Sequence, residues 1–361
     1  MKINLTEIGE KNIEHKTPYF LFSKEMIRKQ YGKIKEISDR VIYPVKTNPN
    51  KKIIDTLESI GSYFFVSSID ELKKIKNKKN AFLSIRSLEK DDIKNALSFG
   101  VINFIAESEK NLVNLITVSN KSMNVFLRFR SPFNSSSRYG NNMIHGFDKD
   151  EIIKNLKKLK KFGGIKFGLH NHLSSQLTNL SIWKKNLKSI FSLLKILKKQ
   201  NIKIDFLDLG GGVPIRYAKE ALIFEKIKKL FEFYFKKYRE VFPKLKIFLE
   251  PGRFIAGPSG VLITKIIEVK NKTAIINSSV YTTSMDTLVV GLELPCYTTS
   301  MEKEKKNYTI RGKGYCSLDI FRKKVKLNKL SAGDYIIFYN SGAYTFSSDF
   351  VDKNKLPLYF E

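Results

Sequence analysis

Residues 40–68 of this chain read RVIYPVKTNPNKKIIDTLESIGSYFFVSS. A β-rich apolar run at 40–46 is followed by an amphipathic helical pattern at 50–61 and by a second β-rich run at 63–68. A short apolar run bounded by turn residues is typical of a strand, whereas apolar residues spaced by three or four are typical of a helix packed on one face. The segment therefore predicts a strand, a helix and a second strand, the repeating unit of an α/β fold.

The same alternation of β-rich and helical segments continues as far as residue 253. The β-rich runs are RVIYPVK (40–46), YFFVSS (63–68), AFLSIR (81–86), VINFIAES (101–108), NVFLRFR (124–130), IKFGLHNH (165–172), IDFLDLGGG (204–212) and IFLEPGR (247–253). Eight strands that alternate with helices predict a (β/α)8 TIM barrel, which we place at residues 17–253. An open doubly wound sheet is the alternative.

The pattern changes after Arg253. Segments such as VLITKIIEVKN (261–271) and DYIIFYNS (334–341) are short and β-rich, with Gly and Asn turns between them and few helix signals. We therefore expect a second domain, a β-sandwich or β-barrel, formed by residues 1–16 together with 254–361.

The formal net charge of +30 raises the question of nucleic-acid binding, because clustered Lys and Arg neutralise phosphates. In 155–164, 192–200 and 224–240, however, the lysines fall at helical spacing opposite apolar stripes. That arrangement is typical of solvated helix faces. We therefore expect no specific nucleic-acid partner.

Two further features bear on where the protein resides. No apolar run approaches the roughly 20 residues that span a bilayer, so no membrane partner is expected. The N-terminus is polar and lacks the apolar stretch of a secretory signal, and the chain has only two cysteines, Cys296 and Cys316. Both observations indicate a cytoplasmic protein.

Polar residues and a run of three glycines lie at the ends of the predicted strands, where the active sites of such barrels lie. They are Lys46, Arg128, Arg130, His170, His172, Gly210, Gly211, Gly212, Glu250 and Arg253. Lys46 ends an apolar run, and a lysine at the edge of a core loses solvation, which lowers its pKa and favours it as an amine nucleophile. The alternative is a strand-end lysine that extends its amine into water.

Four of these features together indicate a cofactor. Gly210–Gly212 allow backbone N–H groups to approach an anion, and a helix expected to begin after them would add a favourable dipole. Arg253 is a second phosphate donor. With Lys46 as an amine and Glu250 as a carboxylate for a ring nitrogen, the set fits pyridoxal 5'-phosphate, and it requires no metal.

The chain also resembles a known family over nearly its whole length, the fold-type III pyridoxal phosphate-dependent decarboxylases, which include ornithine, diaminopimelate and carboxynorspermidine decarboxylases and share the alanine racemase-like barrel. The motifs that carry the resemblance are TPYFLF (17–22), YPVKTN (43–48), HNHLSSQ (170–176), DLGGGVP (208–214), EPGRFIAGPSG (250–260), GYCSLD (314–319) and GAYTFS (342–347). Their order along the chain matches that of the family.

The resemblance implies a role for each matching residue. Lys46 is the Schiff-base lysine, and His172 stacks on the cofactor ring. Ser175, Gly211, Gly212, Arg253 and Tyr344 contact its phosphate. Glu250 pairs with the ring nitrogen, and Arg128 lies beside the cofactor. Cys316 enters the site from the partner subunit of a homodimer with shared active sites and helps to protonate the product.

The implied reaction is the removal of the α-carboxylate of a small amino-acid substrate as carbon dioxide, which leaves an amine. A decarboxylase of a natural-product or siderophore intermediate, an amino-acid racemase and a non-catalytic regulatory homologue are the alternatives. Glu250 argues against the racemase, because the resembling alanine racemases place an arginine at the ring nitrogen.

Three departures from the family pattern leave the substrate open. Cys316 is followed by Ser317, Leu318 and Asp319, so the loop is shorter by one residue and lacks the acid that usually follows the cysteine. Phe65 stands where an aspartate is usual, and Ser174 replaces a glycine.

Four more residues are assigned before the structure is considered. Tyr281, Asp286 and Glu293 are candidates for binding the distal end of the substrate, although surface or dimer contacts are the stronger expectation for them. His170 is expected to be a satisfied structural histidine rather than an acid or base.

Overall fold

The computed structural model describes residues 15–118, 123–133, 145–217, 224–345 and 358–360. The described residues divide into two compact units. The barrel unit lies within Gln30–Ile215 and Ala221–Gly252, and the β unit lies within Met1–Lys29, Arg216–Glu220 and Arg253–Glu361.

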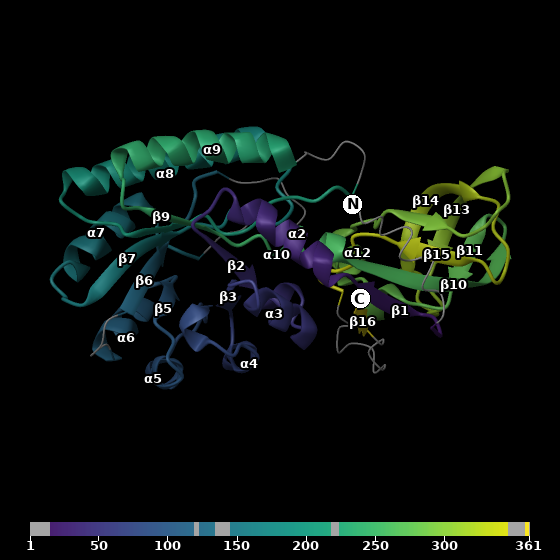
Figure 1. The fold of residues 1–361 in the computed structure, drawn as a ribbon, viewed down its shortest axis with the longest axis horizontal. Helices are drawn as coiled ribbons and strands as arrows, with labels where there is room; N and C mark the ends of the chain where they lie inside the picture. The colour runs from purple at the N-terminus through teal and green to yellow at the C-terminus, as the bar shows by residue number, and fades with distance from the viewer. Residues whose placement is uncertain (1–14, 119–122, 134–144, 218–223, 346–357, 361) are drawn as a thin grey trace. The chain divides into compact units, whose positions relative to one another are not determined.

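The barrel unit contains a closed barrel of eight parallel strands in chain order (Figure 1). They are β2 (Arg40–Pro44), β3 (Tyr63–Val66), β4 (Ala81–Leu83), β5 (Asn103–Ala106), β6 (Met123–Arg128), β7 (Ile165–His170), β8 (Phe206–Asp208) and β9 (Lys246–Leu249). Pairing of β9 with β2 closes the ring. The predicted TIM barrel is confirmed, and the open sheet is excluded.

Aromatic side chains fill the interior of the barrel. Phe82 and Phe126 meet with ring centroids 5.2 Å apart, and Phe248 packs against both. These rings are fully buried together with Ile42 and Ile105. Large apolar side chains exclude water from the interior, so the polar strand-end residues sit above a dry core.

Helices surround the barrel in Figure 1. They are α3 (Lys51–Glu58), α4 (Ile69–Lys73), α5 (Lys90–Ser98), α6 (Glu109–Val118), α7 (Lys149–Leu159), α8 (Leu180–Lys199) and α9 (Phe224–Val241), while α2 (Lys24–Lys35) precedes β2. Two short 3-10 turns, η1 (Val45–Thr47) and η2 (Lys78–Asn80), complete the unit.

Helix α8 shows how charge is distributed on these helices. Its N-cap Asn179 accepts a hydrogen bond from Ser181 N at 2.9 Å, which satisfies one of the free N–H groups of the first turn. Trp183, Leu187 and Leu194 are buried, and the helix also carries lysines that are exposed. The predicted solvated lysine face is therefore confirmed for this helix.

The β unit is built on an eight-stranded sheet in the order β12-β15-β10-β11-β13-β14, with β1 paired to β10 and β16 paired to β1. The strands are β1 (Tyr19–Phe22), β10 (Gly260–Lys270), β11 (Thr273–Ile276), β12 (Cys296–Thr298), β13 (Lys305–Arg311), β14 (Ile320–Asn328), β15 (Tyr335–Phe338) and β16 (Leu358–Phe360). Its helical segments are α10 (Gly252–Ala256), η3 (Gly257–Ser259), α11 (Val280–Thr283) and α12 (Met285–Val290).

The segment TPYFLF belongs to the sheet of this β unit. Tyr19 is opposite Ile263 and Phe22 is opposite Gly260 in an antiparallel ladder. The domain boundaries expected from the sequence, at 16/17 and 253/254, stay a prediction, and residues 1–14 of the first segment lie outside the described residues. No helix in the described part of the chain is long and apolar enough to cross a membrane.

Candidate active site

Lys46 lies in the 3-10 turn η1, directly after β2. Val45 and Thr47 on either side are buried, whereas Lys46 is exposed. The turn packs its two neighbours into the core and leaves Lys46 on its exposed side, so the expectation that Lys46 is partly buried is wrong. Its Nζ lies 5.6 Å from the centroid of the Phe65 ring, a cation–π contact. The amine is therefore accessible to a ligand.

Three buried side chains converge where β7, β8 and β9 end. His170 is 1% exposed, Asp208 is 0% exposed and Glu250 is 5% exposed. One ligand atom of each lies within 4.8 Å of the others, and His170 Nε2 is 3.6 Å from Glu250 Oε1. Asp208 was not singled out from the sequence, although an acid at a strand end, two residues before the first glycine, was a signal that could have identified it.

Burial dominates the electrostatics of these three groups. It lowers the pKa of His170 to about 4 and raises the pKa of Glu250 to about 7, the latter against the opposing charge of Lys46. Burial, followed by the charge of Glu250, holds the pKa of Asp208 well above its usual range. The expectation that His170 is a satisfied residue is wrong, because neither ring nitrogen has a hydrogen-bond partner among the described residues.

Arg128, at the end of β6, forms an ion pair with Glu107, which follows β5. Both side chains are largely buried, and Ser84 Oγ donates a hydrogen bond to Glu107 Oε1 at 3.2 Å. Burial alone would raise the pKa of Glu107, but the charge and hydrogen bond of Arg128 outweigh it and leave the pKa below its usual range. Glu107 is the second-last residue of the fourth predicted run and was also missed.

The glycines after β8 lie tightly against neighbouring backbone. A Cβ on Gly211 would lie 2.6 Å from the carbonyl oxygen of Glu250, and a Cβ on Gly212, whose φ is +94°, would lie 2.2 Å from that of Ser174. The N–H of Gly211 donates to His172 Nδ1 at 3.0 Å and so orients the half-buried ring. Ser175 is half-buried in the neighbouring loop.

No helix follows the glycines directly, which corrects that expectation. Residues 213–217 are not helical, and α9 begins at Phe224. The side chain of Gln176 explains the extended path, because it donates to the carbonyl oxygen of Ile215 at 2.5 Å and accepts from its N–H at 3.0 Å.

Arg253 and Tyr344 belong to the β unit. Arg253 is 5% exposed and forms an ion pair with Asp286. It also donates to the hydroxyl of Tyr217 at 3.1 Å, and its guanidinium lies 4.6 Å from the centroid of the Tyr344 ring. Asp286 is therefore engaged by Arg253. Glu293 likewise contacts Arg322 at 3.6 Å and accepts from Lys323 N at 2.9 Å.

The loop that carries Cys316 is held by Asp319. Cys316 is exposed, and its Sγ accepts a hydrogen bond from the hydroxyl of Tyr281 at 2.7 Å. The buried carboxylate of Asp319 accepts from the N–H groups of Gly314 and Val280, each at 2.9 Å. The carboxylate of Asp319 therefore stabilises the loop from within and is not available to bind a ligand.

Known proteins are similar to this chain over most of its length. The profile of the family "Pyridoxal-dependent decarboxylase, pyridoxal binding domain" matches residues 24–257. The chain belongs to this family. Diaminopimelate decarboxylase of Campylobacter jejuni is 26% identical over 370 aligned positions, which cover 95% of this chain and 90% of the relative. Lysine/ornithine decarboxylase of Selenomonas ruminantium is 22% identical, with 91% and 85% covered.

Solved structures show the same fold for this decarboxylase. Diaminopimelate decarboxylase from Helicobacter pylori, complexed with L-lysine, superposes with a TM-score of 0.87 at 22% identity, covering 99% of this chain and 94% of that one. The predicted pyridoxal phosphate-dependent amino-acid decarboxylase is confirmed, and the matches do not support the alternatives.

The residues of the barrel unit fit the cofactor of the decarboxylase. Glu250 Oε1 is buried and has no hydrogen-bond partner among the described residues, so it is able to accept a hydrogen bond from the ring N–H of the cofactor. The glycines allow the backbone after β8 to pack closely against the Ser174 and Glu250 segments, where a Cβ would not fit, and Lys46 is exposed. When bound, the cofactor supplies the electron sink that accepts the electron pair released with carbon dioxide.

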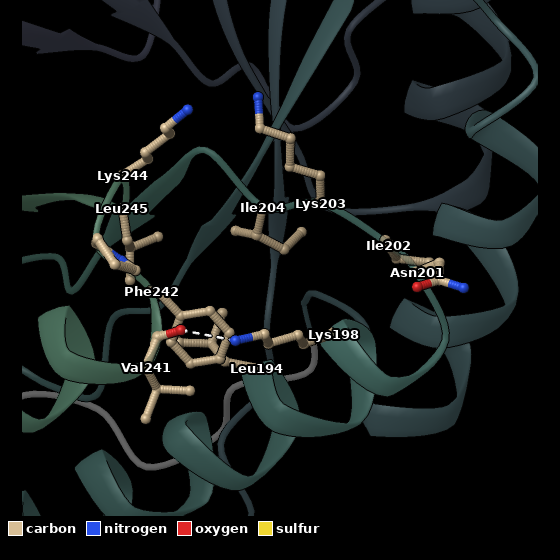
Figure 2. A pocket seen from close by; sticks show the side chains of 11 residues that line it. Leu194, Lys198, Asn201, Ile202, Lys203, Ile204, Val241, Phe242, Lys244 and Leu245 are labelled. Carbon is tan, nitrogen blue, oxygen red and sulfur yellow. Dashed lines mark hydrogen bonds between the residues drawn. The ribbon is translucent and has the colours of Figure 1, made fainter.

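The decarboxylase also has an apolar pocket of about 460 Å³ at the other end of its strands. Figure 2 shows it between the segment 194–204, which precedes β8, and the segment 241–245, which precedes β9. Lys198 Nζ donates to the carbonyl oxygen of Val241 at 2.9 Å there. Active sites of such barrels lie at the carboxyl ends of the strands, so this pocket is not the active site.

Proposed function

We propose that the decarboxylase removes the α-carboxylate of an amino acid at the carboxyl ends of its barrel strands, with Lys46 binding the cofactor covalently through Nζ. The observation that carries the proposal is the buried carboxylate of Glu250 in the same barrel unit as the exposed amine of Lys46. A carboxylate that faces the ring nitrogen keeps that nitrogen protonated, which strengthens the electron sink.

The remaining barrel residues orient the cofactor. We assign His172 to the ring face, because its Nδ1 is fixed by Gly211 N–H and its ring is half-buried. Ser175 and Gly212 bind phosphate, and Gly211 contributes chiefly by lacking a Cβ, since its N–H is used by His172. Arg128 lies beside the cofactor and is oriented by its ion pair with Glu107.

Residues of the β unit complete the assignment. Arg253 and Tyr344 bind phosphate, as the family resemblance implies, and their stacked arrangement supports a shared role. Cys316 protonates the product from the partner subunit of a homodimer. Its exposure and the hydrogen bond from Tyr281 support this role, because both favour proton exchange. An active monomer in gel filtration would contradict it. The cytoplasmic location stays a prediction.

The proposed substrate belongs to the ornithine, diaminopimelate and carboxynorspermidine class. The relatives named as diaminopimelate decarboxylases support this class. The chain lacks an acid directly after Cys316, and Asp319 is committed to backbone N–H groups. We therefore propose that the distal group of the substrate is not bound by a carboxylate of this loop.

The test is mass spectrometry of the pyridoxal phosphate-loaded protein incubated with ornithine, lysine, arginine, meso-diaminopimelate, carboxynorspermidine and glutamate. We expect one amine product with loss of carbon dioxide, absent from the Lys46→Ala variant. A product that also forms with Lys46→Ala would contradict the role of Lys46. No product from any substrate, with protein that still binds the cofactor, would contradict the proposed substrate class.

A further inference from the structure

The assigned roles leave Asp208 and His170 unexplained. Each has an atom within 4.8 Å of a carboxylate oxygen of Glu250, and both are almost completely buried. Three of their atoms have no hydrogen-bond partner among the described residues: Asp208 Oδ2 and both ring nitrogens of His170. The other carboxylate oxygen of Asp208 accepts from Gly210 N at 2.8 Å, which fixes the orientation of the group. A buried polar atom that makes no hydrogen bond destabilises the folded state. We therefore ask where the protons of this cluster lie, because a proton on one group can form a hydrogen bond to another.

The charges around the cluster limit that arrangement. Lys46 and Arg128 favour a negative Glu250, while Glu107, paired with Arg128, opposes it. His170 cannot supply a positive charge at neutral pH, because burial keeps it neutral and the ring of Phe65 stacks against it with centroids 6.4 Å apart. Two carboxylates buried this close cannot both ionise without a cation between them.

We propose that Asp208 is a positioning residue that keeps one proton on the Asp208–Glu250 pair, so that Glu250 carries the single negative charge presented to the cofactor. Asp208 donates this proton from Oδ2 towards Glu250, while Oδ1 accepts from Gly210 N–H. Protonated Asp208 thereby holds the carboxylate of Glu250 in a fixed orientation. The inference rests on the proposed function in one respect, namely that Glu250 faces the ring nitrogen.

The arrangement of donors and acceptors makes the proposal testable by an isosteric change. An asparagine at 208 has an amide oxygen to accept from Gly210 N–H and an amide N–H to donate towards Glu250, as protonated aspartic acid does. A leucine of similar volume can do neither. If Asp208 acts as a charged group instead, asparagine and leucine should be equally harmful.

The first measurement is infrared difference spectroscopy of the full-length, pyridoxal phosphate-loaded protein at pH 7. We expect the wild type minus Asp208→Asn spectrum to contain the C=O stretch of a protonated carboxylic acid that shifts in D2O. The matched control is Asp205→Asn, at the other end of the β8 segment, where the carboxylate pairs with Lys203 at 2.6 Å. Loss of ionised carboxylate bands in Asp208→Asn, with no protonated band, would overturn the proposal.

The second measurement is the dissociation constant of pyridoxal 5'-phosphate. We expect Asp208→Asn to stay within about threefold of wild type and Asp208→Leu to weaken binding by about 10- to 100-fold, the effect of one hydrogen bond to a charged group. Equal weakening in the two variants would refute the hydrogen-bonding role.

These outcomes separate the inference from the proposed function. A protein that decarboxylates a substrate but lacks the protonated carboxyl band retains the function and loses the inference. A protein that shows the band, binds the cofactor and decarboxylates no member of the substrate class retains the inference and loses the proposed function.

Discussion

Replacement of Asp319 by alanine should loosen the loop that carries Cys316. The change removes the carboxylate that accepts from Gly314 N–H and Val280 N–H, both at 2.9 Å, in a position with 0% exposure. A hydrogen bond to a charged group contributes about 1.5–3 kcal/mol, so two such bonds correspond to about 3–6 kcal/mol of local stability.

Hydrogen–deuterium exchange is the appropriate assay, because it reports local opening without requiring the two units to unfold together. A loss of about 3 kcal/mol accelerates exchange roughly 100-fold in peptides covering 278–284 and 310–319. Asp334→Ala is the matched control, since its half-buried carboxylate accepts a hydrogen bond from Ser331 N at 2.8 Å. Unchanged exchange in Asp319→Ala would refute the structural role of this carboxylate.

Three further predictions concern the glycine loop, the buried histidine and the thiol. Gly212→Ala places a Cβ 2.2 Å from the Ser174 carbonyl oxygen at a φ of +94°, so we expect loss of cofactor binding by absorbance titration. Burial lowers the pKa of His170 to about 4, so between pH 6.5 and 4 only the unfolded state takes up the proton. In acid titrations over this range, the free energy of unfolding of the wild type should therefore fall by about 3 kcal/mol more than that of His170→Gln. The hydrogen bond from Tyr281 lowers the pKa of Cys316, so Tyr281→Phe should shift the pH profile of thiol alkylation upward.

Each of these predictions has a control within the chain. Gly163→Ala adds a Cβ that meets no atom within 4 Å and should bind the cofactor as wild type does. At pH 8 both states of His170 are neutral, so a pH-dependent difference that persists there would contradict the titration. Cys296 has a pKa raised to about 11 by burial and should react slowly in both proteins. An unchanged profile for Cys316 in Tyr281→Phe would show that the hydroxyl does not act on the thiol.

Much of the site follows from local sequence. The alternation of apolar runs and amphipathic segments specifies strands and helices, because each must bury one face, and parallel strands in a barrel present their carboxyl ends together. Lys46, Arg128 and Glu250 were therefore predictable as strand-end residues. Glu107 and Asp208 carried the same signal and were missed, because the groups that they meet, Arg128 and Glu250, come from other strands and are brought to them only by the fold.

The barrel, the β-rich C-terminal region and the family motifs with their cofactor could be predicted from the sequence, because they depend on patterns within a few tens of residues. Which charged groups meet depends on the folded chain. Asp208 and Glu250 are distant in the chain yet share a buried position with His170, and Asp319 turns inward to bind Val280 N–H. Burial and pairing depend on the positions of atoms brought together by the whole fold, and a carboxylate's charge state depends on both.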